Sequence, residues 1–194
     1  MELDVFEKAL VYAMQKHHGM RRKAEDIPYL LHPMEVAVIA ASMTNDPDIL
    51  AACLLHDTVE DTDTSLEEIK ALFGPRIHAY VACETENKRH DEPANMTWMI
   101  RKEESLAKLR NTDDINVKII WLADKLANIR AFYRSYQKDG DAMWKMFNQS
   151  DPAKQAWYYG QVRLLTEDLK NHAAWQEYSK YLTILFQGGK DETD

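Results

Sequence analysis

The stretch LLHDTVEDT, residues 54–62, places one imidazole and three carboxylates next to an apolar run. His56 and Asp57 follow two leucines that end a segment typical of a buried helix. On a continuing helix, Glu60 and Asp61 would lie one turn beyond this pair. Buried without partners, these charges would each cost several kcal/mol, whereas carboxylates and neutral imidazole together are good ligands for a divalent cation. The stretch therefore predicts a metal site.

Helical patterns recur along the whole chain, and strand patterns are scarce. The sequence TSLE at 64–67 resembles a capping box, and a Gly-Pro pair at 74–75 separates two helices. The expected helices span about 3–18, 33–41, 46–56, 65–73, 76–84, 97–111, 114–136, 152–171 and 173–186. Residues 85–96 contain almost nothing apolar and predict an exposed loop. We therefore expect a single compact all-α bundle of about nine or ten helices, with a flexible tail at 188–194.

Composition excludes several classes of protein. With 45% hydrophobic and 29% charged residues in 194, the chain can form one well-buried core. No uncharged apolar run approaches the ~20 residues that a membrane span needs, and the acidic start MELDV resembles no secretory signal. Cys53 and Cys83 make no disulfide framework, which favours a reducing, cytoplasmic location.

The net charge of −8 argues against broad binding of nucleic acid. One basic cluster departs from this balance, and its residues are Lys16, His17, His18, Arg21, Arg22 and Lys23. A solvated helix end would explain the cluster. A rim that binds phosphate would also explain it, because an acidic protein needs a local positive field to attract an anionic substrate.

Two further segments carry candidate ligands. PYLLHP at 28–33 places His32 beside a proline that fixes the direction of the next helix. LADKLANIR at 122–130 places Asp124 within an apolar helical pattern, with Asn128 four residues later on the same face. Each residue alone has a structural explanation: a capping histidine, an ion-paired aspartate and a surface amide. Their occurrence together makes a shared site the better interpretation.

Together with RRK at 21–23 and FG at 73–74, these motifs resemble, in order and spacing, the HD-domain phosphohydrolases. Within that family they are similar to the hydrolase half of the RelA/SpoT proteins and to the stand-alone small alarmone hydrolases. The resemblance covers about residues 5–135. It implies an HD-type helical domain over 1–187, made of that catalytic core and of C-terminal helices at about 139–187.

The resemblance also implies an activity, which is metal-dependent removal of the 3′-pyrophosphate from ppGpp or pppGpp to give GDP or GTP and pyrophosphate. Carried over by position, four residues would hold one Mn²⁺ ion per chain: His32, His56, Asp57 and Asp124. Two carboxylates would provide acid and base catalysis: Glu60 and Asp61. Three residues would bind the guanine nucleotide: Arg22, Lys23 and Asn128. The chain is too short for the synthetase portion of RelA/SpoT proteins, so we expect hydrolysis without synthesis.

The sequence departs from the family pattern at two places. Trp121 stands where family members often carry a lysine, three residues before Asp124, and the nearest basic residue, Lys118, lies one turn earlier. The loop AEDI at 24–27 leaves Arg21, Arg22 and Lys23 as alternatives for stacking on the base. The substrate is therefore less constrained than the reaction, and NADPH, a deoxynucleotide or a pyrophosphorylated RNA end would use the same metal site. An antitoxin-like binding protein is the alternative from another class.

Residues 137–194 lie outside the resemblance and are rich in tryptophan, tyrosine and phenylalanine. Helices that pack back onto the core would explain this composition. The alternatives are a lid over the nucleotide and a surface for a possible homodimer.

Overall fold

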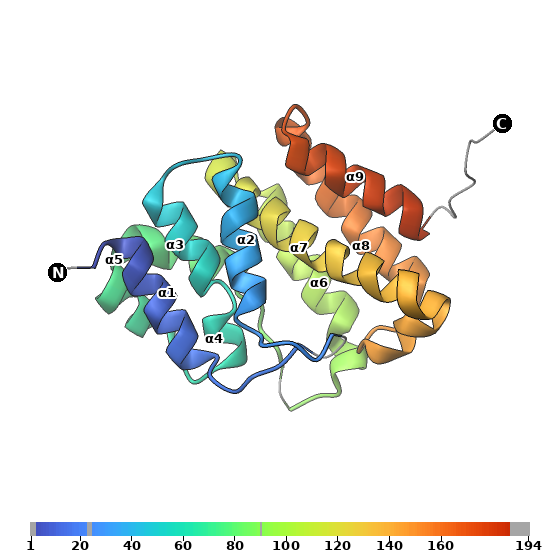
Figure 1. Ribbon diagram of the computed structural model, residues 1–194, viewed down its shortest axis with the longest axis horizontal. Coiled ribbons are helices and arrows are strands. Elements are labelled where there is room, and N and C mark those ends of the chain that lie inside the picture. Colours follow the sequence, from blue (N-terminus) through green and yellow to red (C-terminus); the bar gives the residue numbers. More distant parts are fainter. Residues whose placement is uncertain (1–2, 23–24, 90, 187–194) are drawn as a thin grey trace.

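Helices account for almost all regular structure in this protein. The computed structural model describes residues 3–22, 25–89 and 91–186, so the expectations for Lys23 and for the tail 188–194 lie outside the described residues. Within these ranges the α-helices are α1 (Val5–Lys16), α2 (Leu31–Ala41), α3 (Pro47–Leu55), α4 (Thr58–Asp61), α5 (Leu66–Glu84), α6 (Ala94–Arg110), α7 (Ile115–Asp139), α8 (Pro152–Leu165) and α9 (Ala173–Phe186) (Figure 1). Two 3-10 helices, η1 (Gly140–Met146) and η2 (Glu167–Leu169), lie on either side of α8. The expected all-α class is confirmed.

Several helices begin at a side chain that accepts a hydrogen bond from the first turn. The aspartates that cap α3, α7 and α8 in this way are Asp46, Asp114 and Asp151. The capping box expected at 64–67 is wrong by one residue, because Ser65 caps α5 and its Oγ accepts from Glu68 N at 3.1 Å. The Thr64 hydroxyl is engaged elsewhere, at 3.0 Å from the Tyr12 hydroxyl.

The helical backbone is interrupted within the polar motif at 54–62 and again at the Gly-Pro pair. α3 ends at Leu55, and His56 and Asp57 form a turn before the one-turn helix α4, so the expected helix through His56 ends one residue early. The two helices expected around the Gly-Pro pair follow one another as the arms of α5. They meet at a kink where Gly74 has a φ of 86°. The turn after α3 brings Asp57 Oδ2 to 3.2 Å from His56 Nε2.

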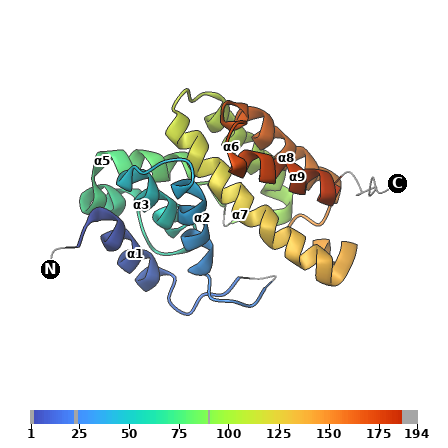
Figure 2. The same cartoon turned by 45° about the horizontal axis from the view of Figure 1, so that its top comes forward.

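α7 is the longest helix and lies at the centre of the bundle (Figures 1 and 2). α1 and α2 both pack on α3, α2 also packs on α7, and α8 and α9 cover another side of α7. Aromatic rings join the C-terminal part to this centre: the ring centroid of Phe132 lies 5.5 Å from that of Trp144 and 5.4 Å from that of Tyr159. This is the packing onto the core that the aromatic composition suggested. α8 stops at Leu165, short of the expected end at 171. None of the described helices is both long and apolar enough to cross a bilayer.

Candidate active site

Four predicted ligands meet where α2, α7 and the turn after α3 come together. His32, His56 and Asp124 are buried, and one ligand atom of each lies within 4.8 Å of the others. His32 Nε2 lies 3.1 Å from Asp124 Oδ1. Asp57 approaches the same two rings, with its Oδ2 3.3 Å from His32 Nε2 and 3.2 Å from His56 Nε2. The structure thus brings together residues that are far apart in the sequence.

The hydrogen bonds of His56 show which atom it offers to this cluster. His56 Nδ1 lies 2.7 Å from the Cys53 carbonyl oxygen, which can only accept, so Nδ1 carries the proton. His56 Nε2 is buried without a hydrogen-bond partner among the described residues and lies 3.6 Å from Asp124 Oδ1. Burial lowers the pKa of His56, but the carboxylates of Asp57 and Asp124 outweigh it and raise this pKa well above its usual range.

A site that draws positive charge to a buried nitrogen between two carboxylates suits a divalent cation. A lone pair on His56 Nε2 would otherwise face negative oxygens, which is unfavourable. The donor set of two imidazoles and two carboxylates is also one that transition-metal ions accept, and it leaves coordination positions for other groups on a six-coordinate ion. The residues present therefore fit a bound metal.

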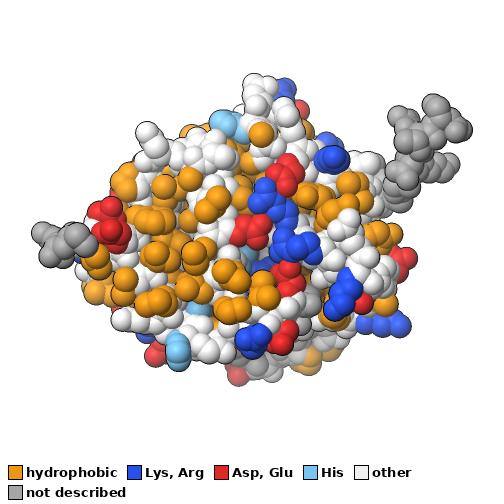
Figure 3. All heavy atoms as spheres, viewed as in Figure 1, with side chains coloured by type: hydrophobic (Ala, Val, Ile, Leu, Met, Phe, Trp, Pro, Cys, Tyr) orange, Lys and Arg blue, Asp and Glu red, His pale blue; other side chains and the backbone are white. Residues whose placement is uncertain are grey.

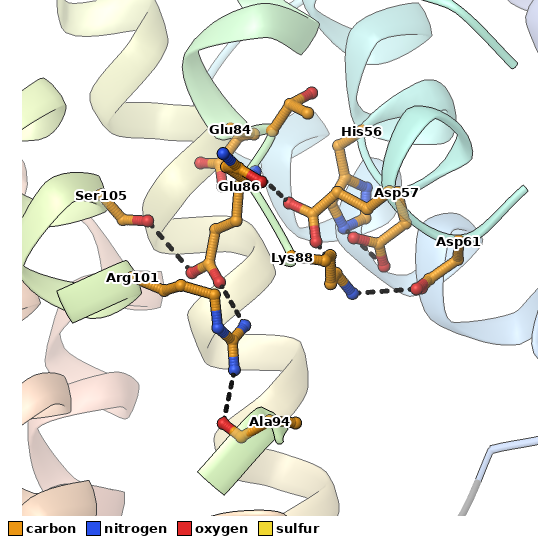
Figure 4. Close-up of polar contacts among 12 residues, drawn as sticks. His56, Asp57, Asp61, Glu84, Glu86, Lys88, Ala94, Arg101 and Ser105 are labelled. Atoms are coloured by element: carbon orange, nitrogen blue, oxygen red, sulfur yellow. Dashed lines mark hydrogen bonds and ion pairs between the residues drawn. The ribbon is translucent and has the colours of Figure 1, made fainter. Parts of the chain in front are cut away.

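The predicted acid and base residues lie on α4, beside the ligands. Glu60 Oε1 accepts a hydrogen bond from Glu86 N at 2.6 Å, and its Oε2 lies 3.0 Å from Lys88 Nζ. Lys88 Nζ also donates to Asp61 Oδ1 at 2.9 Å (Figure 4). Burial raises the pKa of Glu60, and the charges of Asp57 and Glu86 add to this effect, while Lys88 opposes it. A carboxylate with a raised pKa is a better proton acceptor near neutral pH.

Tyr29 connects the ligand cluster to α4. Its hydroxyl lies 2.6 Å from Asp57 Oδ2 and 2.9 Å from Asp61 Oδ2, and it can donate its proton to one of them at a time. The sequence motif PYLLHP contains Tyr29, but only His32 of that motif was predicted to belong to the site. A tyrosine three residues before a ligand, near the start of a helix, is the signal that was available.

Two adjoining cavities form the cleft around these residues. The inner cavity has a volume of about 200 Å³ and is bounded by Glu60, Asp61 and three of the four predicted ligands, which are His32, Asp57 and Asp124. The outer one, of about 320 Å³, is lined mainly by aromatic, amide and cationic side chains. The residues shared by both cavities are Tyr29, Arg101, Lys102, Lys125 and Asn128. The cleft thus leads from the polar cluster to an aromatic chamber whose walls include Trp98, Phe132, Phe147, Tyr158 and Tyr159.

Arg22 and Asn128, which were predicted to bind substrate, line the cleft and are linked to the ligands. Arg22 Nη2 donates to Asn128 Oδ1 at 3.0 Å, and Asn128 Nδ2 donates to Asp124 Oδ1 at 2.7 Å. The Arg22 side chain is only 15% exposed, so it is part of the cleft wall and not of a solvated helix end. The basic cluster therefore contributes at least one residue to the site.

The cleft also contains a buried cluster of charged residues that was not predicted from the sequence. Glu86 Oε2 accepts from Arg101 Nη1 at 3.0 Å, and its Oε1 accepts from Ser105 Oγ at 3.0 Å (Figure 4). Glu86 Oε1 also accepts from Lys102 Nζ at 2.6 Å. The Glu86 side chain is only 8% exposed. Burial raises the pKa of Glu86, but Lys102 and Arg101 outweigh it and lower this pKa to about 2. The prediction of an exposed loop at 85–96 is therefore wrong for Glu86, and it is also wrong for 94–96, because α6 begins at Ala94.

At Trp121, where the sequence departs from the family pattern, the indole ring packs against a lysine of the cleft. Trp121 is buried, and Lys125 Nζ lies over its ring at 4.9 Å from the centroid while pairing with Asp124. On the other side, Lys125 Nζ is 3.8 Å from Glu84 Oε2, and burial raises the pKa of Glu84 to about 8 although Lys125 opposes this. The tryptophan face therefore helps to hold a lysine at the junction of the two cavities.

A family model described as HD domain matches residues 9–147, which is most of the chain and includes all four predicted ligands. The chain belongs to the HD-domain family.

Relatives of this HD-domain protein carry two kinds of name. It is 41% identical over 128 residues to the GTP pyrophosphokinase rsh of Brucella melitensis, a match that covers 65% of this chain and 16% of the relative. It is 38% identical over 128 residues to the guanosine-3′,5′-bis(diphosphate) 3′-pyrophosphohydrolase of Drosophila melanogaster, a match that covers 64% of this chain and 68% of the relative. The HD-domain protein thus spans less than a fifth of the length of the long relatives and about two thirds of the short one.

Two solved structures have a similar fold. The first, described as a metazoan ortholog of SpoT that hydrolyzes ppGpp and plays a role in starvation responses, has a TM-score of 0.73 at 26% identity. It matches 95% of this chain and 96% of its own. The second, lmo0812 from Listeria monocytogenes, has a TM-score of 0.70 at 28% identity and matches 80% of this chain and 99% of its own. The expected membership of the HD-domain family, on the side of the alarmone hydrolases, is confirmed.

Proposed function

We propose that this HD-domain protein removes the 3′-pyrophosphate of ppGpp and pppGpp in a metal-dependent reaction that gives GDP or GTP and pyrophosphate. The observation that carries the proposal is the meeting of two imidazoles and two carboxylates at the inner end of a cleft that continues into a cationic and aromatic chamber. The names of the short relative and of the first similar structure support the same reaction. We expect a cytoplasmic location, where guanine nucleotides occur.

The metal would be a single Mn²⁺ ion held by His32, His56, Asp57 and Asp124. When bound, such an ion lowers the pKa of water and neutralises phosphoryl oxygens. The Cys53 carbonyl keeps the His56 ring in the orientation that points Nε2 toward Asp57 and Asp124.

Glu60 is the proposed general base and Asp61 its partner. Glu60 lies in the inner cavity, is largely buried, and has a raised pKa, so it can accept the proton of a water that attacks the phosphorus. Lys88 holds both carboxylates through its ammonium group, and Glu86 N fixes the second oxygen of Glu60. Asp61, hydrogen-bonded to Tyr29, is placed to orient the base or to serve the leaving group.

The substrate would lie along the cleft with its phosphates inward. Arg101, Lys102 and Lys125 line both cavities and can face the phosphate charges. Arg22 and Asn128 are placed to bind the nucleoside, and the aromatic chamber offers faces on which a purine can stack.

The decisive experiment compares purified protein, loaded with Mn²⁺, on ppGpp, pppGpp, NADPH, a deoxynucleoside triphosphate and a 5′-pyrophosphorylated RNA. We expect pyrophosphate and GDP or GTP from the first two, with a kcat/KM well above that on the other substrates. Asp124→Asn is the matched control, because it keeps the shape of a ligand and removes its charge. Faster cleavage of NADPH or the deoxynucleotide would overturn the alarmone assignment. If a biological effect of the protein persisted in Asp124→Asn, a binding role would replace the catalytic one.

A further inference from the structure

The outward face of α2 carries an apolar seam. Leu31, Met34 and Val38 are 47%, 39% and 71% exposed, and Ala41 is exposed at the end of the same row. Their spacing of three, four and three residues is that of a helix whose apolar seam packs against another helix. Scattered exposed apolar residues are ordinary, whereas a contiguous row of them marks an interaction surface. Figure 3 shows hydrophobic side chains gathered over the part of this face that α1, α2 and α3 form.

Beside the seam lies an apolar groove. α3 packs against both α1 and α2 and forms the floor of the groove with Leu50 and Leu54. Phe6 and Leu10 of α1 form one wall, and Met34 and Val38 of α2 form the other. The groove has a volume of about 240 Å³, and every residue that lines it is apolar. A projecting side chain and a recess of suitable chemistry therefore occur next to each other on one surface.

The charge distribution favours a second copy of this chain on that surface. A protein of net charge −8 repels itself wherever carboxylates face one another. The acidic residue of α2, Glu35, points to Arg130, at 3.1 Å, and not into the seam. Two copies can thus meet along α2 without burying like charges.

We propose that the α1–α2 face pairs two copies of this chain, with α2 packed antiparallel against α2 of the second copy about a two-fold axis. Such an interface uses the same patch twice, so it needs a projection and a recess in that patch, which Val38 and the groove supply. Two adjacent helices ~16 Å long and ~10 Å wide give a footprint below the ~800 Å² per partner of a standard interface. The dimer is therefore weak and depends on protein concentration, with a dissociation constant in the micromolar range.

Sedimentation velocity across a concentration series that spans the micromolar range tests this pairing. We expect the wild-type protein to shift from monomer to dimer, Val38→Glu to remain monomeric, and Leu164→Glu to behave like wild type. Leu164 is the matched control because it is 57% exposed but lies on α8, away from the seam. A wild-type protein that stays monomeric throughout would overturn the proposal, as would Val38→Glu that dimerises normally.

A charge-pair experiment tests the arrangement of the two α2 helices. Val38→Glu and Val38→Lys should each be monomeric, and an equimolar mixture should regain dimer, because opposite charges then meet across the two-fold axis. Circular dichroism of each variant should match that of wild type, since Val38 is largely exposed. A mixture that stays monomeric would refute the pairing of α2 with itself. The outcome is independent of the proposed hydrolase activity, because Val38 lines neither of the active-site cavities.

Discussion

Glu86→Gln removes one negative charge from the buried cluster that also contains Arg101, Lys102 and Ser105. The amide oxygen can still accept one or two of the hydrogen bonds, but two cations then face each other without a counter-charge. We expect the variant to be less stable than wild type at neutral pH. We also expect it to bind polyanionic substrate more tightly, because Arg101 and Lys102 are no longer neutralised within the cleft.

The expected loss of folding stability in Glu86→Gln follows from the pKa of Glu86. The surrounding cations lower it from its ordinary value of 4.5 to about 2 in spite of burial. A lowering of this size corresponds to ~3 kcal/mol of stability at ~1.4 kcal/mol for each tenfold change in acid dissociation. This value agrees with the ~3–5 kcal/mol of stability that the loss of one partner from a buried ion pair costs. For a chain of this length, ~3 kcal/mol corresponds to a Tm lower by ~6–12 °C.

Chemical and thermal denaturation as a function of pH measures the effect. Because the folded-state pKa of Glu86 is lowered, its stabilisation is complete above the ordinary value of 4.5 and is lost as pH falls toward about 2. The difference between wild type and Glu86→Gln should therefore be largest near pH 7 and should disappear toward pH 2.

Glu104→Gln is the matched control, because Glu104 pairs with Arg89 through a side chain that is 48% exposed and should change little. Equal stability of wild type and Glu86→Gln at pH 7 would refute the reasoning. So would a difference between them that does not depend on pH.

Three further predictions concern the proposed chemistry. Glu60→Gln should keep its bound metal and a near-normal KM while kcat falls by ~10² or more, and steady-state kinetics with a kcat within a few-fold of wild type would exclude Glu60 as the base. His56→Ala and Asp124→Ala should both lose bound Mn²⁺ in metal analysis, and full occupancy in both would contradict the ligand set. Arg22→Ala should raise KM for ppGpp by ~10-fold or more, since a hydrogen bond to a charged group contributes ~1.5–3 kcal/mol, whereas Arg21→Ala, at an exposed ion pair, should not.

The sequence was informative wherever polar residues interrupt an apolar helical pattern. His56 and Asp124 stand within apolar runs that periodicity assigns to buried helices, so their burial and their need for a partner could be predicted. Proline and aspartate at helix starts also placed most boundaries within a few residues. The turn between α3 and α4 could not be predicted in this way, because His56 and Asp57 read equally well as a continuing helix.

The sequence contains no comparable signal for the charged residues of the cleft. Glu86 and Lys88 lie in a segment with almost no apolar residues, and such a segment normally predicts exposure. The burial of Glu86 and the partial burial of Lys88 result from partners on α4 and α6 that are distant in the sequence, so only the three-dimensional structure reveals them. Val38 was missed for the opposite reason, because an apolar residue in a helix predicts burial, whereas here it faces solvent.

The proposed ligands come from three separate segments of the chain, so binding of an ion affects the stability of the fold and the lifetime of the protein in a cell. His32, the His56–Asp57 pair and Asp124 anchor α2, the α3–α4 turn and α7 to one point, so an ion bound there acts as a cross-link within the bundle. Free Mn²⁺ at ~100 times its dissociation constant would add ~2.7 kcal/mol to the stability of the folded state. A shortage of the ion would therefore shorten the lifetime of the protein as well as silence it, since the three segments would open more often to proteases. The supply of the ion would then set the abundance of the protein in addition to the rate of the proposed reaction.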